Sequence, residues 1–130
     1  MKKELDEKLC AKYPKIFVDR HADMRSTAMC WGIECGDGWY WLIDQLCNTI
    51  QRYINDNQHL QIAQVVAEQV KEKYGGLRFY FRGGDNLIEG MVWLAEHLSL
   101  HICETCGSTQ NVSQSEGWIV TLCDKCQKEG

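Results

Sequence analysis

The sequence predicts an α+β fold, in which a small domain of helices and a β-hairpin precedes a four-cysteine module. Helical and strand-like patterns of apolar residues alternate along residues 1–100, and two Cys-x-x-Cys pairs lie within residues 101–130. We therefore expect residues 1–100 to form the core domain and residues 101–130 to form the module. A composition of 45% hydrophobic and 25% charged residues is ordinary for a globular chain.

Composition and charge argue against several classes of protein. No apolar run approaches the roughly 20 residues that a membrane-spanning helix needs, so no membrane partner is expected. No apolar stretch follows the basic residues at the start of the chain, which predicts a cytoplasmic protein without a secretory signal. Eighteen acidic and fourteen basic residues give a net charge of −4, which disfavours non-specific binding to duplex DNA.

The N-terminal segment is predicted to be a short helix followed by a turn and a loop. Residues 3–12 carry two leucines at i,i+4 spacing, and Pro14 ends the helix. Residues 16–18 are expected to form either a short strand or an apolar anchor. The mixed charges of residues 19–26 predict an exposed loop.

A glycine-rich loop comes next. Residues 30–39 hold three glycines and two tryptophans, Trp31 and Trp39, which predicts an irregular backbone. A helix is expected from Trp39 to about Asn55, and Asp37 is placed to cap its N-terminus. The apolar face predicted for this helix consists of Leu42, Ile43, Leu46, Ile50, Tyr53 and Ile54.

The middle of the chain predicts a β-hairpin. Residues 60–66 fit a helix and a strand equally well, whereas residues 68–74 and 77–81 are predicted strands. The Gly75-Gly76 dipeptide between them supplies the positive φ values of a two-residue turn. On the second strand, Leu77, Phe79 and Phe81 are predicted to face one side and Arg78, Tyr80 and Arg82 the other.

A last helix is predicted before the cysteine module, with Asp85 as its N-terminal cap. Apolar residues recur along it at helical spacing, and we expect the face they form to be the buried one. This face consists of Leu87, Met91, Leu94 and Leu98.

The four C-terminal cysteines carry the strongest signal in the sequence. Cys103 and Cys106 form one Cys-x-x-Cys pair, Cys123 and Cys126 form another, and sixteen residues separate the pairs. This spacing is typical of structural zinc sites, in which four thiolates complete a closed tetrahedron around one Zn²⁺. Gly107 suits the sharp turn after the first pair. Between the pairs, residues 118–122 are a predicted strand.

The other four cysteines show no such pairing. Cys47 falls in step with the apolar positions of its predicted helix, so we expect it in the core. Cys30 and Cys35 are expected to be buried thiols, although together with His21 they could also form a second metal site or a thiolate–imidazole pair. No role is predicted for Cys10.

Two histidines near the end of the last predicted helix also have no assigned role. His97 and His101 lie at i and i+4, so they would share a helix face. They could chelate a metal, serve the zinc thiolates as an outer partner, or form a solvated helix end.

Three segments resemble a group of small proteins encoded by tailed bacteriophages. They are residues 31–39, residues 70–80 and the closing four-cysteine pattern, and the likeness extends from about Lys12 to Cys126. Separately, the last thirty residues resemble a zinc ribbon or a treble-clef finger. The phage resemblance implies a protein of the host cytoplasm that binds host factors or neutralises host defence. We expect counter-defence, either by blocking a host factor or by sequestering a phosphorylated nucleotide signal.

The sequence does not favour catalysis. A zinc deaminase would need a His-x-Glu motif, which the chain lacks. A treble-clef nuclease would need a catalytic histidine beside the zinc site, and residues 106–130 contain no histidine. Glu34 and Asp37 in the glycine loop are better explained as a solvated residue and a helix cap. We therefore predict a binding protein that is not an enzyme.

The glycine loop and two arginines are the predicted ligand site. Glycines let a ligand approach backbone N–H groups, and arginine forks suit phosphate. The candidate residues are Trp31, Gly36, Asp37, Gly38, Trp39, Arg78 and Arg82. For the two tryptophans, a place in the core beside tightly packed glycines explains the sequence at least as well. The sequence does not distinguish such a ligand from a host protein that contacts exposed aromatic residues.

The alternative function is that of a nucleic-acid-binding zinc protein in phage gene expression or replication. Basic and aromatic residues interleave along the predicted hairpin, which could hold phosphates and stack bases. The residues concerned are Lys71, Lys73, Tyr74, Arg78, Phe79, Tyr80 and Arg82. Buried phenylalanines under a solvated sheet face are the interpretation that we favour for them.

Overall fold

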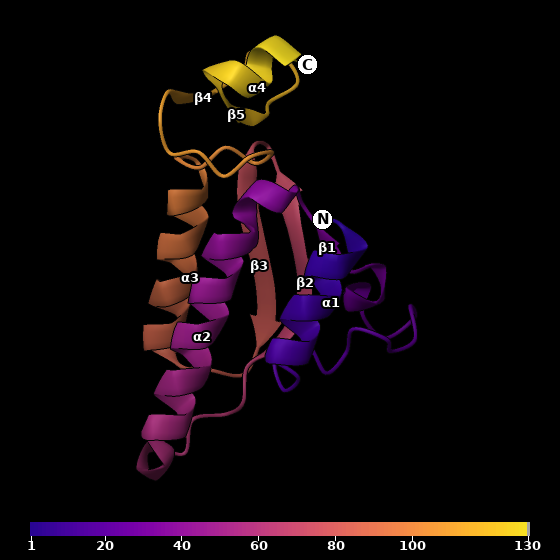
Figure 1. Ribbon diagram of the computed structural model, residues 1–130. Helices are drawn as coiled ribbons and strands as arrows, with labels where there is room; N and C mark the ends of the chain where they lie inside the picture. Colours follow the sequence, from indigo (N-terminus) through magenta and orange to yellow (C-terminus); the bar gives the residue numbers. More distant parts are fainter. Residues whose placement is uncertain (130) are drawn as a thin grey trace.

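The computed structural model describes residues 1–129 and confirms the predicted α+β class (Figure 1). Gly130, the last residue of the predicted module, lies outside the described residues. A three-stranded sheet of order β1-β2-β3 forms the body, with β1 parallel to β2 and β2 antiparallel to β3. A second, two-stranded sheet pairs β4 with β5 in the cysteine module.

The elements have the following bounds. The helices are α1 (Lys3–Lys12), α2 (Tyr40–Asp56), α3 (Asn86–Ser99) and α4 (Asp124–Glu129). The strands are β1 (Ile33–Glu34), β2 (Val66–Lys73), β3 (Gly76–Arg82), β4 (Val112–Gln114) and β5 (Thr121–Cys123). Short 3-10 turns are η1 (Ala28–Trp31), η2 (Asp37–Trp39) and η3 (Gln58–Leu60).

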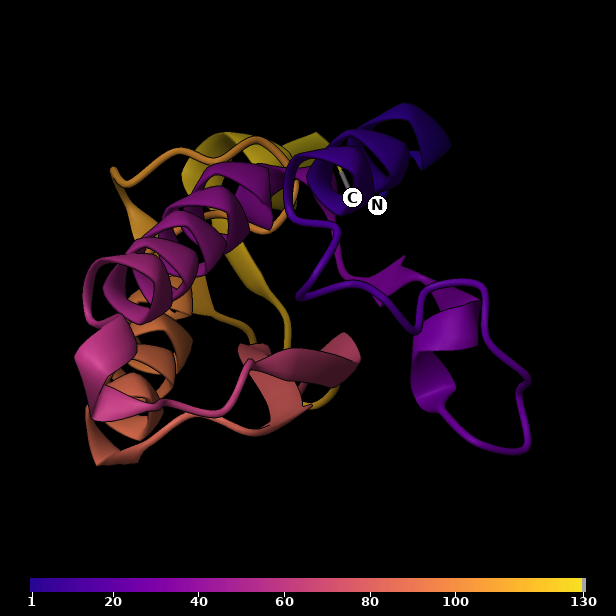
Figure 2. The same ribbon diagram turned by 90° about the horizontal axis from the view of Figure 1, so that it is seen from below.

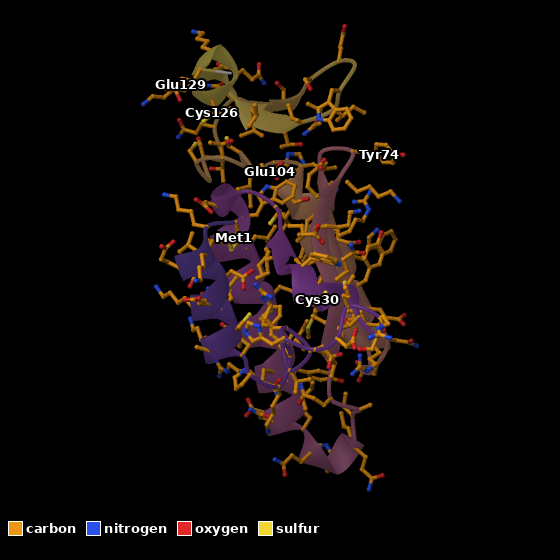
Figure 3. The ribbon with its side chains drawn as sticks, turned by 90° about the vertical axis from the view of Figure 1, so that its right-hand side faces the viewer. Met1, Cys30, Tyr74, Glu104, Cys126 and Glu129 are labelled. Atoms are coloured by element: carbon orange, nitrogen blue, oxygen red, sulfur yellow. The ribbon has the colours of Figure 1, made fainter. Side chains whose placement is uncertain are left out.

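Helices α2 and α3 lie side by side on one face of the sheet, and the core fills the space between them and the strands (Figures 1 and 2). The cysteine module lies beyond the end of the sheet, near the hairpin turn that carries Tyr74 (Figure 3). We call residues 102–129 the finger. Side chains without exposed area in the core include Leu9, Trp39, Ile43, Ile50, Val70 and Leu77.

The hairpin is confirmed, but its turn lies one residue earlier than predicted. Tyr74 and Gly75 form the turn with φ values of 53° and 82°, whereas Gly76 already pairs with Lys73 in the ladder. A two-residue turn of this type needs a positive φ at both central positions, and tyrosine adopts one here. Leu77 and Phe79 are buried and Tyr80 and Arg82 are exposed, as the alternation predicts.

The predicted buried face of α3 is wrong. Ile88, Val92, Ala95 and Ser99 face the core, whereas Leu87, Leu94 and Leu98 are exposed and Met91 is half-buried. Both sets recur at helical spacing, so periodicity alone does not separate them. The face that contains Ser99 turns toward the sheet, because the Ser99 hydroxyl accepts a hydrogen bond from the buried Leu77 N–H at 2.9 Å. The Asp85 cap is confirmed by a 3.1 Å bond from the Ile88 N–H.

The predicted Asp37 cap of α2 is also wrong. Asp37 begins η2, and α2 starts only at Tyr40 with no side chain capping it. The Asp37 carboxylate instead accepts a 2.7 Å hydrogen bond from the Lys2 N–H and so holds the start of α1. The segment at residues 16–18 is an anchor rather than a strand, since Ile16 and Phe17 are buried in a turn.

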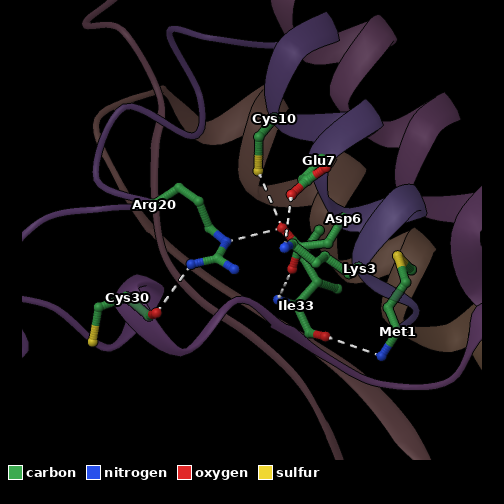
Figure 4. A network of polar contacts seen from close by, with 8 residues as sticks. All are labelled: Met1, Lys3, Asp6, Glu7, Cys10, Arg20, Cys30 and Ile33. Carbon is green, nitrogen blue, oxygen red and sulfur yellow. Dashed lines mark hydrogen bonds and ion pairs between the residues drawn. The ribbon is translucent and has the colours of Figure 1, made fainter.

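A buried ion pair ties α1 to the rest of the body (Figure 4). The Asp6 carboxylate accepts hydrogen bonds from Arg20 Nε at 2.9 Å and from the Ile33 N–H at 2.8 Å. Burial disfavours its charged form, but these donors outweigh burial and hold the pKa of Asp6 below its ordinary value. Arg20 also donates to the Cys30 carbonyl at 3.0 Å, so this residue of the predicted exposed loop lies half-buried.

We expect Asp6→Asn to lower the free energy of unfolding by about 3 kcal/mol at neutral pH, because it leaves the Arg20 guanidinium partly buried without a counter-charge. Urea denaturation measures the change. Glu7→Gln on the same helix is the matched control, since the pair of Glu7 with Lys3 spans 3.8 Å at the surface and contributes at most about 0.5 kcal/mol.

The same pair predicts the pH dependence of stability. The folded pKa of Asp6 lies below the ordinary 3.8, so its contribution is complete above that value and is lost as the pH falls through the folded pKa. The difference between wild type and Asp6→Asn should therefore shrink in acid. Equal stabilities of Asp6→Asn and Glu7→Gln at neutral pH would contradict the assignment.

Candidate metal centre

The four cysteines of the finger come together as a possible metal site. Cys103 and Cys106 lie on the loop after α3, Cys123 ends β5, and Cys126 lies in α4. Their sulfur atoms all lie within 4.8 Å of one another, and the Cys106 and Cys123 sulfurs are 3.7 Å apart. A disulfide would need about 2.05 Å, and all four thiols are free. The predicted cluster is confirmed as a site that could hold one metal ion.

Local backbone geometry builds the site. Gly107 has a φ of 80°, as expected after Cys106, and its N–H donates to the Cys103 carbonyl at 2.9 Å. The β4–β5 hairpin then returns the chain, with Val112 opposite Cys123, and α4 begins at Asp124. The predicted strand at residues 118–122 starts only at Thr121, because the residues before it form the bend between the two strands.

The thiols of the cluster differ in how readily they ionise. Burial disfavours the Cys103 thiolate, but N–H groups of Cys106, Cys123 and Thr105 outweigh it and lower the pKa of Cys103 to about 6. Burial and the neighbouring sulfurs raise the pKa of Cys126, because further negative charge in the cluster is repelled. A cation between the sulfurs would favour their thiolate forms.

The finger is held against the body by the backbone of the glycine loop. The Gly38 N–H donates to the Glu104 carbonyl at 2.7 Å, and the Gly36 N–H donates to the Glu104 carboxylate at 2.9 Å. The Trp39 indole N–H donates to the Ile102 carbonyl at 2.8 Å. We call residues 36–39 the glycine seat. The glycine seat therefore holds the segment on either side of Cys103, the first cysteine of the cluster.

Only glycine fits at two positions of the glycine seat. A Cβ on Gly38 would overlap the Cys103 carbonyl, and one on Gly36 would overlap the Glu104 carbonyl. The sequence predicts backbone N–H groups that face a ligand here, and these groups instead face the finger. Burial raises the pKa of the Glu104 carboxyl, against the opposing effect of the Gly36 N–H.

A second contact joins the finger to the β2–β3 turn. The buried Thr121 hydroxyl donates to the Gly75 carbonyl, and the Gln114 amide donates to Thr121 at 3.1 Å and to the Leu100 carbonyl at 2.8 Å. The finger therefore contacts the body at the glycine seat and at the hairpin turn. Glu104 and Thr121 are contact residues that the sequence does not reveal, because their partners lie far away in the chain.

The structure places the seven predicted ligand residues in different surroundings. Trp39 is fully buried, whereas Trp31 is 65% exposed. Arg82 pairs with Asp19 at 2.9 Å, and Arg78 donates to the Leu77 carbonyl at 2.9 Å. Within residues 1–129 no hydrogen bond or ion pair joins the glycine loop to either arginine. Ligand binding by the set stays a prediction.

The remaining cysteines do not form a second cluster. Cys47 is fully buried in α2, which confirms its core position. Burial raises the pKa of Cys35 to about 12, and burial together with Asp6 raises that of Cys10 to about 12. His21 is exposed. In the part of the chain that the structure describes, the finger cysteines are the only group of three or more potential metal ligands.

The hairpin carries basic side chains on the face of the sheet away from α2 and α3. We call Gln69, Lys71, Lys73, Arg78, Tyr80 and Arg82 the open face. Lys71 lies directly opposite Arg78 in the ladder, and Gln69 lies opposite Tyr80. Lys71, Lys73 and Arg78 form no ion pair with any carboxylate of residues 1–129. Lys71 lies opposite Arg78 because the turn is formed by Tyr74 and Gly75. With the predicted turn, one residue later, Lys71 would lie opposite Tyr80 instead.

Exposed aromatic rings extend the open face toward the finger. Tyr80 is 41% exposed and Tyr74, which projects from the hairpin turn, is 72% exposed (Figure 3). Trp118 in the finger is 87% exposed. Tyr74 and Trp118 line a hollow of about 410 Å³ between the turn and the finger.

Among residues 1–129, no helix combines the length and the apolar character that crossing a membrane requires.

Known proteins supply no further guide to this site. Comparison with known protein families, with curated proteins and with solved structures finds nothing that matches this chain.

Proposed function

We propose that the four-cysteine centre holds one structural zinc ion. Four sulfur ligands in a tetrahedron are typical of zinc, and a Zn–S distance of about 2.3 Å places the sulfurs about 3.8 Å apart. The 3.7 Å between the Cys106 and Cys123 sulfurs agrees with this value. A closed set of four protein ligands leaves no coordination position for a substrate, so the zinc organises the finger and its attachment to the glycine seat.

We propose further that the protein binds its target without catalysis. The thiols of Cys10 and Cys35 have pKa values raised to about 12, which leaves them protonated and poorly nucleophilic at neutral pH. The Glu104 and Asp37 carboxylates accept backbone N–H groups that hold segments of the chain together. These observations support a binding role for the surface.

The proposed binding surface is the open face, and the opposition of Lys71 and Arg78 is the observation that carries this proposal. Like charges directly opposite each other in a sheet destabilise it. Glu34 lies beside Lys71 on β1, but neither Lys71 nor Arg78 forms an ion pair with it or with any other carboxylate of residues 1–129. An anion between the two side chains would relieve the repulsion. Arginine and lysine together suit a phosphate group.

The ligand that we propose carries both phosphate and aromatic bases. Tyr80 and Tyr74 are exposed along the same hairpin as the basic side chains, and aromatic rings of this kind stack on bases. From Tyr74 to Arg82 the strand covers about 25 Å, which exceeds one nucleotide and spans several. Single-stranded nucleic acid therefore fits the whole face, and a phosphorylated nucleotide signal fits part of it.

The biological role follows from which of these ligands binds. Sequestering a nucleotide signal would make the protein a counter-defence factor of the kind that the phage resemblance implies. Binding a single strand would place it in phage gene expression or replication. Because the whole chain carries a net charge of −4, binding depends on the local charge of the open face.

We expect a labelled oligothymidylate to bind in low salt and to lose affinity steeply as salt rises, measured by fluorescence anisotropy. The double variant Lys71→Gln/Arg78→Gln should weaken binding by about tenfold or more. It should also reduce the slope of log affinity against log salt by about 1.4, the value for two phosphate contacts on a single strand. The variant Lys3→Gln/Lys128→Gln removes the same charge elsewhere and should bind as wild type does.

Two results would contradict the proposal. One is no binding of the oligonucleotide or of any phosphorylated nucleotide in low salt; the other is equal weakening by both double variants. Mononucleotides that raise the melting temperature as much as the oligonucleotide does would favour the nucleotide signal over the strand.

A further inference from the structure

Helix α3 carries a second apolar face, of which only Met91 packs partly against the core. Leu87, Met91, Leu94 and Leu98 recur at intervals of four, three and four residues, the spacing with which helices pack against other helices. We call these four residues the apolar stripe. Leu87 is 55% exposed, Leu94 is 58% exposed and Leu98 is 39% exposed. Helix α3 is therefore apolar on two sides, of which one lacks a partner within residues 1–129.

Helix α2 extends the apolar stripe into a groove. Trp41, Leu42 and Leu46 lie across from Met91, Leu94 and Leu98, and the groove holds about 190 Å³. None of the nine residues that line it carries a charge, and Trp41 is 64% exposed beside it. An uncharged groove with a large exposed tryptophan at its edge marks an interaction surface.

The spacing of the apolar stripe allows a second copy of the chain to match it. The intervals of four, three and four residues read the same in both directions along the helix. An antiparallel copy, related by a two-fold axis between Met91 and Leu94, places Leu87 against Leu98 and Met91 against Leu94. Every apolar residue then meets an apolar residue, as a self-complementary two-fold interface requires.

We infer that this face binds a second copy of the chain. The α2–α3 pairs of the two copies then form an antiparallel four-helix arrangement, with Trp41 of each copy covering the layer formed by Leu98 and the second copy's Leu87. This inference is independent of the open face, which lies on the opposite side of the sheet. The dimer leaves both open faces accessible.

The size of the surface sets the expected strength of the dimer. The exposed parts of Trp41, Gln45, Thr49 and the apolar stripe amount to about 500 Å² in each copy, so about 1,000 Å² is buried in total. This is the lower limit for a specific interface. We therefore expect a weak dimer whose population rises with protein concentration.

Sedimentation equilibrium over a wide concentration range tests the dimer. Wild type should approach twice the 15.0 kDa of one chain as its concentration rises. Leu94→Glu should weaken association more than about 100-fold, because the interface would bury two unpaired carboxylates. Trp93→Glu is the matched control: Trp93 is 78% exposed and lies about 100° around the helix from Leu94, outside the apolar stripe.

A charge exchange tests the antiparallel register. Leu87→Lys and Leu98→Glu should each be monomeric alone, and an equimolar mixture should recover a dimer, because the lysine of one copy faces the glutamate of the other. Both residues are exposed in the single chain, so circular dichroism should show unchanged melting below the dissociation constant.

The inference is overturned if wild type stays monomeric at the highest concentration, in which case a helix of a different protein is left as the partner of the groove. It is equally overturned if Leu94→Glu remains dimeric, if Trp93→Glu dissociates as fully as Leu94→Glu does, or if the charge-exchange mixture stays monomeric.

Discussion

Cys103→Ser should abolish stoichiometric zinc binding and unfold the finger while leaving most of the body folded. Structural zinc contributes on the order of 10–16 kcal/mol in small finger peptides, which is more than any other single contact in this chain can supply. We call residues 103–107 the knuckle; its turn is closed by the Cys103 carbonyl, which accepts the Gly107 N–H. Metal analysis of the purified protein measures the loss.

Hydrogen exchange provides the local readout for the same variant. The Gly38 N–H donates to the Glu104 carbonyl, so it should exchange quickly once the knuckle loosens. The Ile50 amide, in the middle of α2, should stay protected. Cys30→Ser changes a half-buried thiol outside the cluster and should keep both the zinc and the protection. Full zinc content in Cys103→Ser would refute the site.

Gly38→Ala should destabilise the protein by about 4 kcal/mol and separate the finger from the body. Its Cβ would overlap the Cys103 carbonyl, so the knuckle must move and the bonds to Glu104 and Trp39 are strained or lost. Because the four sulfur ligands are untouched, zinc should remain bound. Urea denaturation together with metal analysis distinguishes this outcome from loss of the metal.

Gly90→Ala is the matched control for this substitution. Gly90 lies in α3, and a Cβ there would meet no atom within 4 Å in the part of the chain that the structure describes. Alanine favours helix more than glycine does, so stability should rise by about 0.5–1 kcal/mol. If Gly38→Ala were as stable as wild type, the glycine seat would not be a close contact.

The metal cluster was predictable because it depends on residues that are close in the sequence. Contacts between residues far apart in the sequence were not predictable. Two Cys-x-x-Cys pairs bring their sulfurs together through short turns, and Asp85 caps α3 through the next turn of the same helix. The partner of Asp37 lies 35 residues away at Lys2, and neighbouring residues give no sign of it. The predicted cap failed for this reason.

Ambiguous patterns account for the other differences. Helix α3 carries two apolar faces, and periodicity identifies both without saying which one meets the sheet. In the hairpin, tyrosine rather than the second glycine took the left-handed position, which moved the turn by one residue. That shift replaces Tyr80 by Arg78 as the neighbour of Lys71, and the open face depends on it.

The attachment of the finger has a consequence for the order of folding. All four sulfur ligands lie within residues 103–126, so an ion can close this loop quickly, whereas the bond from Gly36 to Glu104 spans 68 residues and must wait for the body. During synthesis the body emerges first, with its two glycine amides still exposed to water. We expect docking of the finger on these amides to be the last step of folding, and to be faster once the proposed ion has closed the loop.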